Sequence, residues 1–375
     1  MTNAASPSAA HMLAFAREHP HDSLYACLAL VVAEQPAALE LLQAAPPARR
    51  WSTLLFAALH DRLLALRDGG AELPALAAYY PSLGGSRPPD AELGGALEAF
   101  VAGEAGLLRE TIATRTTQTN EVGRSAVLWP ALAEIARTHG DRPLALFDFG
   151  CSAGLNLSVD AMRVAYRQAD GSPWFDAGSA GAEAPVLVCR LLADPPPTSA
   201  WRIACRMGVD RAPVPLNDER ALRWLRACLW PGETARAERF ERALALARAA
   251  NHEVRAADDG LDVLAAWLRA LPAGVTPVLF NSWVLAYFTA DELAAHTRRV
   301  LALVREHGLV WLSAEDDERL AATAGLRAEP ARHPTAHGTP THWSVTWRDE
   351  AKELRSRLVA RSHAHGEWLE WLAPR

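Results

Sequence analysis

The stretch LALFDFGCSAGLN, residues 144–156, decides the fold class. It opens with an apolar run from Leu144 to Phe149, which is typical of a buried β-strand and carries one acidic residue, Asp148. Gly150 and Gly154 then mark a tight turn, because glycine adopts backbone angles that other residues avoid. The pattern predicts a strand, a turn and the start of a helix.

Short apolar runs alternate with helical patterns over the rest of the chain. Strands are predicted over residues 144–149, 186–189, 201–207, 254–257, 278–282, 309–313 and 342–347. Helices are predicted over residues 153–163, 218–229, 235–249, 262–271 and 291–307. Buried strands separated by helices predict an α/β fold, with a Rossmann-like, mostly parallel sheet and helices on both of its faces. The last run alternates apolar and polar residues, which predicts an antiparallel, half-exposed strand.

The residues before this region carry only helical periodicity. From His11 to about Trp129 apolar residues recur at helical spacing, with breaks at glycines and prolines. The sequence therefore predicts an all-helical N-terminal domain over residues 1–140 and an α/β domain over residues 141–375.

Composition limits the class of protein. The chain has 375 residues, of which 50% are apolar and 22% charged, with a net charge of -6, as expected of a globular protein of about two domains. Its only lysine is Lys352, so no lysine-rich strip is present to bind nucleic acid. The five cysteines form no Cys-x-x-Cys pair, and no apolar run approaches the length of a membrane span. We expect a cytoplasmic protein without a membrane anchor.

The first interpretation of the turn is a cofactor loop. The pattern Asp148-x-Gly150-x-Ser152-x-Gly154-x-Asn156 resembles motif I of class I S-adenosylmethionine-dependent methyltransferases. The resemblance implies a methyltransferase-type sheet whose loop cradles the methionine part of S-adenosylmethionine, with amide groups of a helix N-terminus facing the ligand. This sequence departs from the motif at Ser152, where a glycine is common.

The second interpretation is the nucleophile elbow of a serine hydrolase. Residues 150–154 also match Gly-x-Ser-x-Gly, with Ser152 as nucleophile and a later histidine as base. The candidate bases are His333, His337, His342, His363 and His365. An elbow follows several strands, one of which supplies the oxyanion loop, whereas the residues before Leu144 are predicted to be helical, which favours the cofactor loop over the elbow or a structural turn. A Gly-x-Gly-x-x-Gly loop is absent, which disfavours a nicotinamide enzyme.

Other cofactor-binding residues are expected at the carboxyl ends of the later strands. Asp210 is a candidate for the ribose hydroxyls, or is a turn residue. Asp258 and Asp259 are candidates for the adenine amine, or cap the following helix. Asn281, Ser282 and Trp283 end the central strand and occupy the position of motif IV, beside the transferred methyl group, although Trp283 is equally a candidate core residue.

Three residues are candidates for catalysis: Glu315, Tyr287 and Arg124. Glu315 is a candidate general base, although it begins a run of acidic residues that predicts a solvated face. Arg124 could clamp a substrate carboxylate, with Gln118, Asn120 and Tyr287 as further substrate-binding candidates. The alternative for residues 118–124 is a polar linker between domains.

The histidines do not predict a metal site. His333-x-x-x-His337 contains Pro334 and cannot lie on a regular helix, and the pair His363-x-His365 alone is a weak signature. The sequence therefore predicts no metal site.

A longer resemblance covers nearly the whole chain. It rests on the ordered motifs Asp22–Tyr25, Leu54–His60, Tyr79–Pro81, Gln118–Arg124, Ser152–Leu157, Trp224-Leu225, Trp230-Pro231, Ser282–Tyr287 and His365-Gly366-x-Trp368. These resemble the bacterial family catalogued as domain of unknown function 2332. The resemblance implies a methyltransferase-like fold with an added helical domain, and it assigns no catalytic residues.

The leading hypothesis is an enzyme that transfers the methyl group of S-adenosylmethionine to a small molecule, mainly by positioning the reactants. The alternatives are a methyltransferase-like scaffold that serves as a partner subunit or hosts other small-molecule chemistry, and a serine hydrolase. A small-molecule substrate is the expected partner, with a protein partner or a second copy of the chain as a further possibility, and neither nucleic acid nor a membrane is expected.

Overall fold

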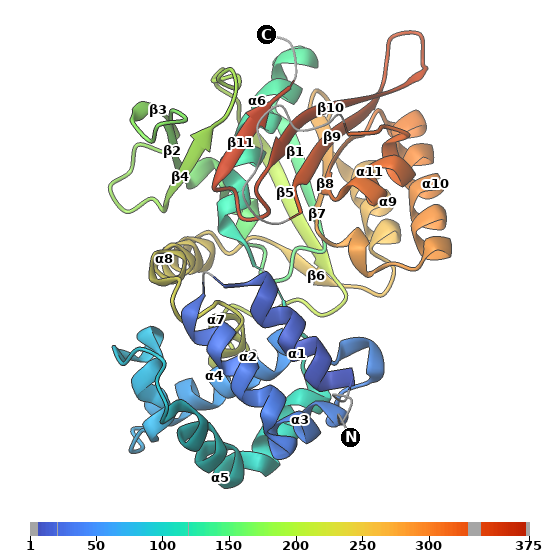
Figure 1. Ribbon diagram of the computed structural model, residues 1–375. Coiled ribbons are helices and arrows are strands. Elements are labelled where there is room, and N and C mark those ends of the chain that lie inside the picture. Colours follow the sequence, from blue (N-terminus) through green and yellow to red (C-terminus); the bar gives the residue numbers. More distant parts are fainter. Residues whose placement is uncertain (1–6, 21, 119, 329–338, 373–375) are drawn as a thin grey trace. The chain divides into compact units, whose positions relative to one another are not determined.

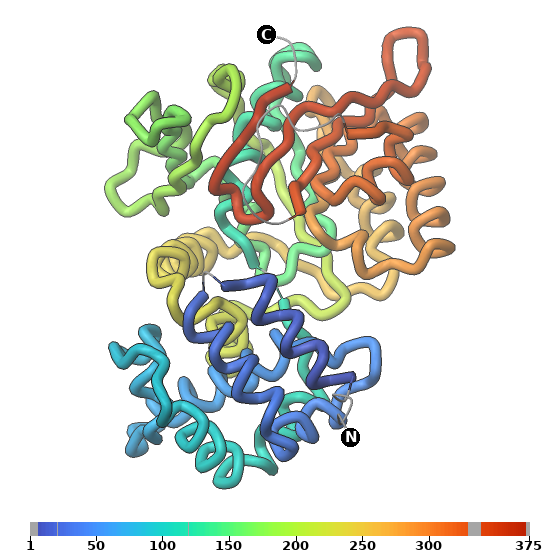
Figure 2. The backbone as a smooth tube through the Cα atoms, viewed as in Figure 1, coloured from blue at the N-terminus to red at the C-terminus, as the bar shows by residue number. Residues whose placement is uncertain are grey.

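The structure is a computed structural model that describes residues 7–20, 22–118, 120–328 and 339–372. The chain forms two compact units (Figures 1 and 2). The helical unit comprises Met1–Thr119 and Asn217–Glu238, and the α/β unit comprises Asn120–Leu216 and Arg239–Arg375.

The α/β unit contains one sheet, with eleven strands in the described residues. They are β1 (Leu144–Phe149), β2 (Arg163–Arg167), β3 (Pro173–Gly178), β4 (Val186–Leu191), β5 (Ile203–Asp210), β6 (Val254–Ala256), β7 (Thr276–Ser282), β8 (Val310–Glu315), β9 (Thr341–Arg348), β10 (Leu354–Ser362) and β11 (Trp368–Trp371). Their order is β3-β2-β4-β11-β10-β9-β8-β7-β1-β5-β6. The five strands β6, β5, β1, β7 and β8 are mutually parallel, and β9 is antiparallel to β8, as predicted.

Helices cover both faces of this sheet. They are α6 (Ser125–Thr138), α9 (Gly260–Ala270), α10 (Ala290–His307) and α11 (Asp317–Ala324). Trp311 of β8 shares an apolar cluster with Leu264 of α9 and Val300 of α10, and these helices lie together beside β7–β9 in Figure 1. The opposite face meets α6, since Arg357 of β10 forms an ion pair with Glu134 at 2.6 Å. The predicted α/β class and mostly parallel sheet are confirmed.

The helical unit is built around one apolar core. Its helices are α1 (Pro7–Glu18), α2 (Ser23–Glu34), α3 (Pro36–Leu41), α4 (Ser52–Asp68), α5 (Leu93–Thr114) and α7 (Glu219–Ala227). Among the described residues no strand precedes β1, which agrees with the predicted helical N-terminus. No single helix in the described ranges is long and apolar enough to cross a membrane. The helical segments Ser23–Glu34 and Pro36–Ala44 reach that length and composition only together, and they are bent by 96° at the break between them.

The division of the chain differs from the boundary expected at residue 140. Helix α6 belongs to the α/β unit, because every residue from Ser125 to Ala136 is buried. Helix α7 belongs to the helical unit, because Trp224 lies in its core and donates its indole N–H to the Thr116 carbonyl at 2.9 Å. Helix α8 (Thr234–Ala250) begins in the helical unit and continues into the α/β unit.

The helix predicted over residues 153–163 is wrong. The chain instead forms a 3-10 segment, η6 (Leu155–Ala161), followed by β2. Arg206 of β5 donates to the Leu157 carbonyl at 2.6 Å and pairs with Asp160, and these contacts hold the 3-10 segment against the sheet.

The half-exposed face predicted for β9 is also wrong. His342, Ser344 and Thr346 are 2%, 3% and 2% exposed, because α10 and α11 pack against this strand. Strands β2, β3, β10 and β11 were not predicted, since charged residues such as Arg163 and Arg357 interrupt their apolar pattern.

Candidate functional site

The strand order makes the end of β1 the expected ligand-binding edge of the sheet. Numbered by their order along the chain, the five parallel strands follow the order 3-2-1-4-5 of a doubly wound sheet. In such sheets ligands bind outside the carboxyl ends of the strands, where the order reverses, which here is the point between β1 and β7. The structure brings Asp148, Asp210, Asn281 and Glu315 to this edge, because each ends, or nearly ends, one of these strands.

The bend between Gly150 and Gly154 uses its own backbone amides. The amides of Gly150 and Cys151 donate to the Val209 carbonyl at 2.8 and 3.2 Å, and that of Gly154 donates to Cys151 at 2.8 Å. The amide of Ser152 donates to Asp210 at 2.9 Å, and that of Ala153 donates to Asn120 at 3.2 Å. The bend therefore directs no spare amide donor at a ligand, and no α-helix N-terminus follows it.

The two glycines of the bend are explained by packing within the protein. Gly150 has φ +76°, and a side-chain carbon there would lie 2.8 Å from the Cβ of Val284. Gly154 has φ +69°, and its added carbon would lie 2.9 Å from Val254. Valine side chains, rather than an open space for a ligand, therefore lie where side chains at these two glycines would be.

Two candidate cofactor residues carry buried or half-buried carboxylates beside the bend. Asp148 is 3% exposed, and its Oδ2 has no hydrogen-bond partner among the described residues. Burial, followed by the nearby Asp210 carboxylate, raises the pKa of Asp148 to about 7, while Arg124 acts in the opposite direction. Asp210 accepts from Ser152 through one oxygen and from the Ala212 amide through the other, both at 2.9 Å.

The two aspartates after β6 differ in their roles. Asp258 is exposed. Asp259 caps α9, since it accepts from the amides of Leu261 and Asp262 at 3.0 and 3.2 Å, and it pairs with Arg299 at 2.7 Å. The capping interpretation therefore holds for Asp259, whose carboxylate is committed to the helix.

A buried polar network joins the ends of β7 and β8. The Asn281 side chain donates to Ser313 and Glu315 at 3.0 and 2.8 Å and accepts from the Trp311 indole at 2.7 Å. Asn281 is fully buried, so its side chain serves this network rather than a cofactor.

Glu315 does not lie on a solvated acidic face. It is 2% exposed, and its Oε1 accepts from the amides of Val284 and Leu285 at 3.1 and 3.2 Å, as well as from Asn281. Its Oε2 has no partner among the described residues. Burial raises the pKa of Glu315 to about 7, so this carboxyl is close to half-protonated near neutral pH.

The loop that Glu315 holds is strained. Trp283 has φ +54°, an unfavourable backbone angle for a bulky residue, and its indole donates to Thr341 at 2.7 Å. The hydroxyl of Ser282 is buried with no partner among the described residues, whereas Tyr287 is 74% exposed. Trp283 is half-buried and so is not a core residue.

The polar segment before α6 makes hydrogen bonds to the loops at the carboxyl ends of β1 and β7. Arg124 is 6% exposed and donates to the carbonyls of Ala364 and Ser282 at 3.0 and 3.4 Å. Asn120 donates to the Ser152 hydroxyl at 2.7 Å, and Asn156 accepts from Ser125 at 3.1 Å.

Arg124 and Asn120 use these hydrogen bonds to hold neighbouring loops in place. This fits a structural role better than a clamp on a substrate carboxylate or a polar linker between domains. Gln118 belongs to the helical unit, where the thiol of Cys228 hydrogen-bonds its backbone.

Comparisons with known proteins identify the family but not the activity. A family model described as uncharacterised proteins conserved in bacteria, DUF2332, matches residues 9–371. The chain belongs to the DUF2332 family. No curated protein matches this DUF2332 chain. Among solved structures, the crystal structure of Streptomyces venezuelae DesVI matches with 14% identity over 64% of this chain and 76% of that one. Its TM-score of 0.24 is too low to support any argument.

Two motifs of the DUF2332 resemblance, far apart in sequence, meet in the structure. A side chain at Gly123 would overlap the His365 carbonyl, and one at Gly366, which has φ +73°, would overlap the Gly123 carbonyl. Sequence reasoning did not identify this contact. Both motifs are glycine-containing, which was the one signal that pointed to close backbone approach.

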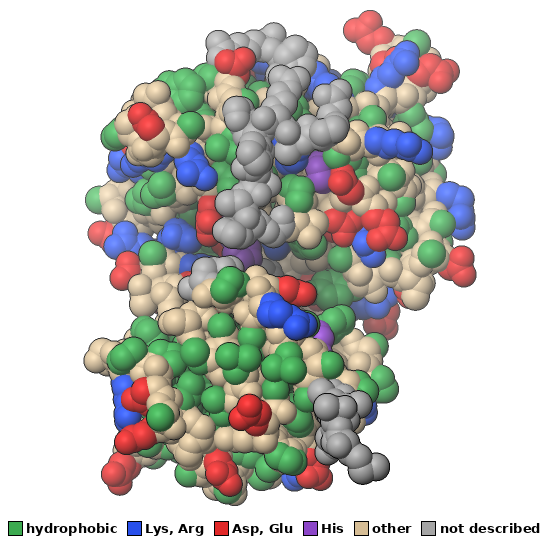
Figure 3. Space-filling model, in the orientation of Figure 1, with side chains coloured by type: hydrophobic (Ala, Val, Ile, Leu, Met, Phe, Trp, Pro, Cys, Tyr) green, Lys and Arg blue, Asp and Glu red, His purple; other side chains and the backbone are tan. Residues whose placement is uncertain are grey.

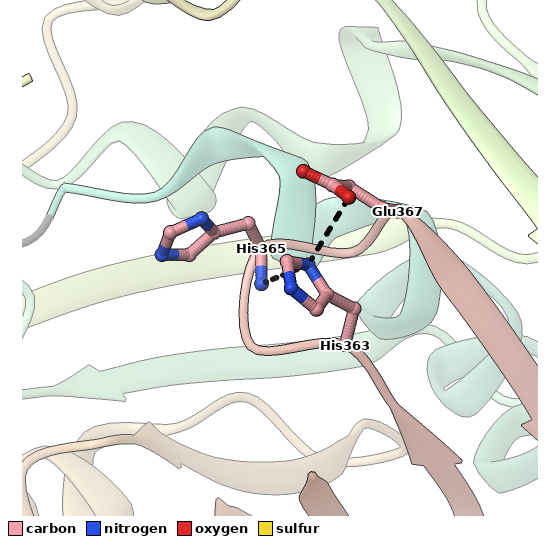
Figure 4. A group of neighbouring side chains, drawn as sticks. All are labelled: His363, His365 and Glu367. Carbon is pink, nitrogen blue, oxygen red and sulfur yellow. Dashed lines mark hydrogen bonds and ion pairs between the residues drawn. The ribbon is translucent and has the colours of Figure 1, made fainter. Parts of the chain in front are cut away.

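The turn at this contact also groups three side chains that bind metals in other proteins. The ligand atoms of His363, His365 and Glu367 all lie within 4.8 Å of one another (Figure 4). The pair His363-x-His365 without Glu367 is too weak a pattern to predict a metal site, so none was predicted.

The structure of this DUF2332 chain does not provide the strands that the serine-hydrolase alternative requires before the nucleophile. Among the described residues no strand precedes β1, so none supplies an oxyanion loop there. The Ser152 hydroxyl accepts from Asn120, and His342 lies 3.4 Å from Asp317 at the start of β9. His333 and His337 lie outside the described residues.

Proposed function

We propose that this chain binds S-adenosylmethionine at the carboxyl ends of β1, β5 and β6 and transfers its methyl group to a small molecule. One observation carries the proposal: three carboxylates, Asp148, Asp210 and Asp258, lie at the ends of three strands that are neighbours in the sheet. A row of acceptors suits a ligand that presents hydrogen-bond donors and positive charge.

The chemistry of this edge favours a phosphate-free nucleoside. S-adenosylmethionine presents an ammonium group, ribose hydroxyls, an adenine amine and a cationic sulfonium, all of which complement carboxylates. A dinucleotide instead needs amide donors for its pyrophosphate, and the amides of the 150–154 bend are already used within the protein.

Each carboxylate has capacity for a ligand. The buried Oδ2 of Asp148 lacks a partner among the described residues, and a ligand donor that displaces the groups covering this oxygen would recover part of the free energy that an unpaired buried acceptor costs. Each oxygen of Asp210 accepts one backbone amide and keeps a further lone pair, which suits a pair of ribose hydroxyls. Asp258 is exposed and suits the adenine amine.

The bound cofactor supplies an electrophilic methyl group, and the protein's own task is positioning. Glu315 is the candidate proton acceptor for the methyl acceptor. Its Oε1 is fixed by three hydrogen bonds, which orients the unpartnered Oε2, and its pKa of about 7 suits proton transfer near neutral pH. Arg124, which holds the carbonyls of Ala364 and Ser282, is a positioning residue.

A small molecule is the proposed methyl acceptor. On the face shown in Figure 3, acidic and basic side chains are interspersed rather than separated by sign. A surface of this kind produces little of the positive field that draws nucleic acid to a protein.

The first test is thermal unfolding with S-adenosylhomocysteine. At about 100 times the dissociation constant, linkage predicts a rise in Tm of about 5 °C or more for the wild type. Asp210→Ala should reduce the rise to about 1 °C or less, while Asp262→Ala, an exposed carboxylate on α9, should leave it unchanged. No rise in the wild-type protein would refute the proposal.

A second measurement separates binding from turnover. Incubation with S-adenosylmethionine and candidate acceptors, followed by mass spectrometry, should detect S-adenosylhomocysteine and a product heavier by one methylene. If the cofactor binds but no acceptor class is methylated, the methyltransferase-like scaffold is favoured. Glu315 and Arg124 are compatible with that alternative, because both side chains hydrogen-bond to backbone groups.

A further inference from the structure

The turn between β10 and β11 carries two imidazoles and a carboxylate at every second position. Figure 4 shows His363, His365 and Glu367 projecting from this turn, with the Glu367 carboxylate directed toward the His363 ring. Their ligand atoms all lie within 4.8 Å of one another. The side chain of Glu367 is 63% exposed, so an ion can reach the group from solvent.

The Nδ1 of His363 makes one long hydrogen bond within the turn, which an ion bound to this nitrogen would replace. It accepts from the His365 backbone amide at 3.3 Å, which places the ring proton of the neutral form on Nε2. The same Nδ1 lies 3.7 Å from Oε2 of Glu367. Ligand atoms around a tetrahedral ion with bonds of about 2.1 Å lie about 3.4 Å apart, so small side-chain rotations bring these two atoms to bonding positions.

The backbone of the turn is fixed before any ion binds. His363 donates to the Trp368 carbonyl at 3.1 Å, and Gly366 donates to the His363 carbonyl at 3.0 Å. The Glu367 carbonyl accepts from Arg190 of β4 at 2.9 Å. Arg124 donates to the Ala364 carbonyl at 3.0 Å. Because the fold holds the turn, an ion has only side-chain freedom to overcome.

The donor set selects the class of ion. Two imidazoles and one carboxylate suit divalent first-row transition metals, whereas Mg²⁺ prefers oxygen ligands and retains its water. Three protein ligands leave at least one coordination position open, as in catalytic rather than structural zinc sites.

We propose that His363, His365 and Glu367 form a binding site for one divalent transition-metal ion, with Zn²⁺ as the probe. The site does not depend on the proposed methyl transfer. The turn that carries these three side chains is held at its Ala364 carbonyl by Arg124, the same residue that holds the end of β7. A metal here would bind an oxygen or nitrogen donor of a small molecule.

Isothermal titration of the untagged, metal-free full-length protein with ZnCl₂ tests the proposal. We expect one Zn²⁺ per chain at this site, no comparable binding of Mg²⁺, and the visible absorption of tetrahedral or five-coordinate Co²⁺ when Co²⁺ replaces Zn²⁺. His363→Ala and Glu367→Gln should each weaken Zn²⁺ binding by about 100-fold or more, since even the loss of residues that only support metal ligands costs about 10–100-fold.

A matched control is available on α10. His307 lies 3.8 Å from Glu306, a separation like that of His363 and Glu367, but no third ligand joins this pair among the described residues. His307→Ala should leave Zn²⁺ affinity unchanged. Circular dichroism establishes that each variant is folded. If folded His363→Ala binds Zn²⁺ as tightly as the wild type, or if His307→Ala weakens binding equally, the assignment of this site is wrong.

Discussion

Glu315 shows at the scale of one residue how burial changes a carboxyl group. Its neighbours Asp316, Asp317 and Glu318 make the sequence resemble a solvated acidic run. As the last residue of β8, however, Glu315 points into the network of Asn281 and the β7–α10 loop. The strand direction, rather than the local composition, decides that this one carboxyl is buried.

The pKa of Glu315 predicts a pH-dependent stability. Burial raises this pKa from 4.5 to about 7, so the folded state holds its proton more tightly than the unfolded state does. The stabilising effect of the proton is complete below about pH 4.5 and is lost as the pH rises through 7, a change of about 3 kcal/mol. Asp148, whose pKa is also raised to about 7, adds a change of the same sign.

Glu315→Gln should remove this part of the pH dependence. The glutamine stays neutral, so the variant should melt at a temperature similar to the wild type at about pH 4.5 and clearly higher at about pH 8. Glu318→Gln, whose side chain is 82% exposed, is the control and should follow the wild type. A difference between wild type and Glu315→Gln that does not vary with pH would contradict the assignment.

At the scale of elements, the bend after β1 is held by its neighbours. The strand and the turn follow from the sequence, because an apolar run and two glycines encode them locally. The following segment is a 3-10 turn rather than the predicted helix, and Arg206 of β5 holds it through the Leu157 carbonyl. The side chains of Val284 and Val254 then fill the space beside the glycines.

Gly150→Ala should destabilise the protein by about 2–4 kcal/mol, because the added carbon is strained at φ +76° and also overlaps Val284. Gly140→Ala is matched in backbone angle, with φ +80°, but its added carbon meets nothing within 4 Å. Gly140→Ala should therefore cost only about 1 kcal/mol. Chemical unfolding measures both variants, and equal losses would show that packing against Val284 is unimportant.

At the scale of the molecule, the helical unit is completed by a distant segment. Trp224 of α7 lies in the core that α1–α5 form, and Arg223 pairs with Asp61 of α4 at 3.0 Å. The periodicity of residues 218–229 identifies a helix but does not indicate which core it joins.

Trp224→Ala should therefore destabilise the helical unit by about 3–5 kcal/mol, since it removes a large buried ring. In hydrogen–deuterium exchange, amides of α2 and α4 should exchange faster while those of β1 and β7 change little. Trp51→Ala, a ring that is 54% exposed, should leave both units unchanged. Faster exchange in β1 and β7 alone would assign α7 to the sheet instead.

The sequence by itself determined the fold class, the helical N-terminus, the central parallel strands and the antiparallel β9. Each of these features is encoded locally. Hydrophobic periodicity shows whether a segment is a helix or a strand and which of its faces are buried, and glycines mark the turns between segments. The carboxylates at the strand ends were also predictable, because parallel strands end at one edge.

Only the tertiary structure decided which of these side chains have their hydrogen-bonding groups used within the protein. Asn281 and Asp259 are occupied by Trp311 and Arg299, while Asp148 keeps an unpartnered oxygen. The grouping of Glu367 with His363 likewise depends on the conformation of the turn. Whether a polar side chain is already hydrogen-bonded depends on partners that are distant in sequence, and a local sequence pattern does not identify those partners.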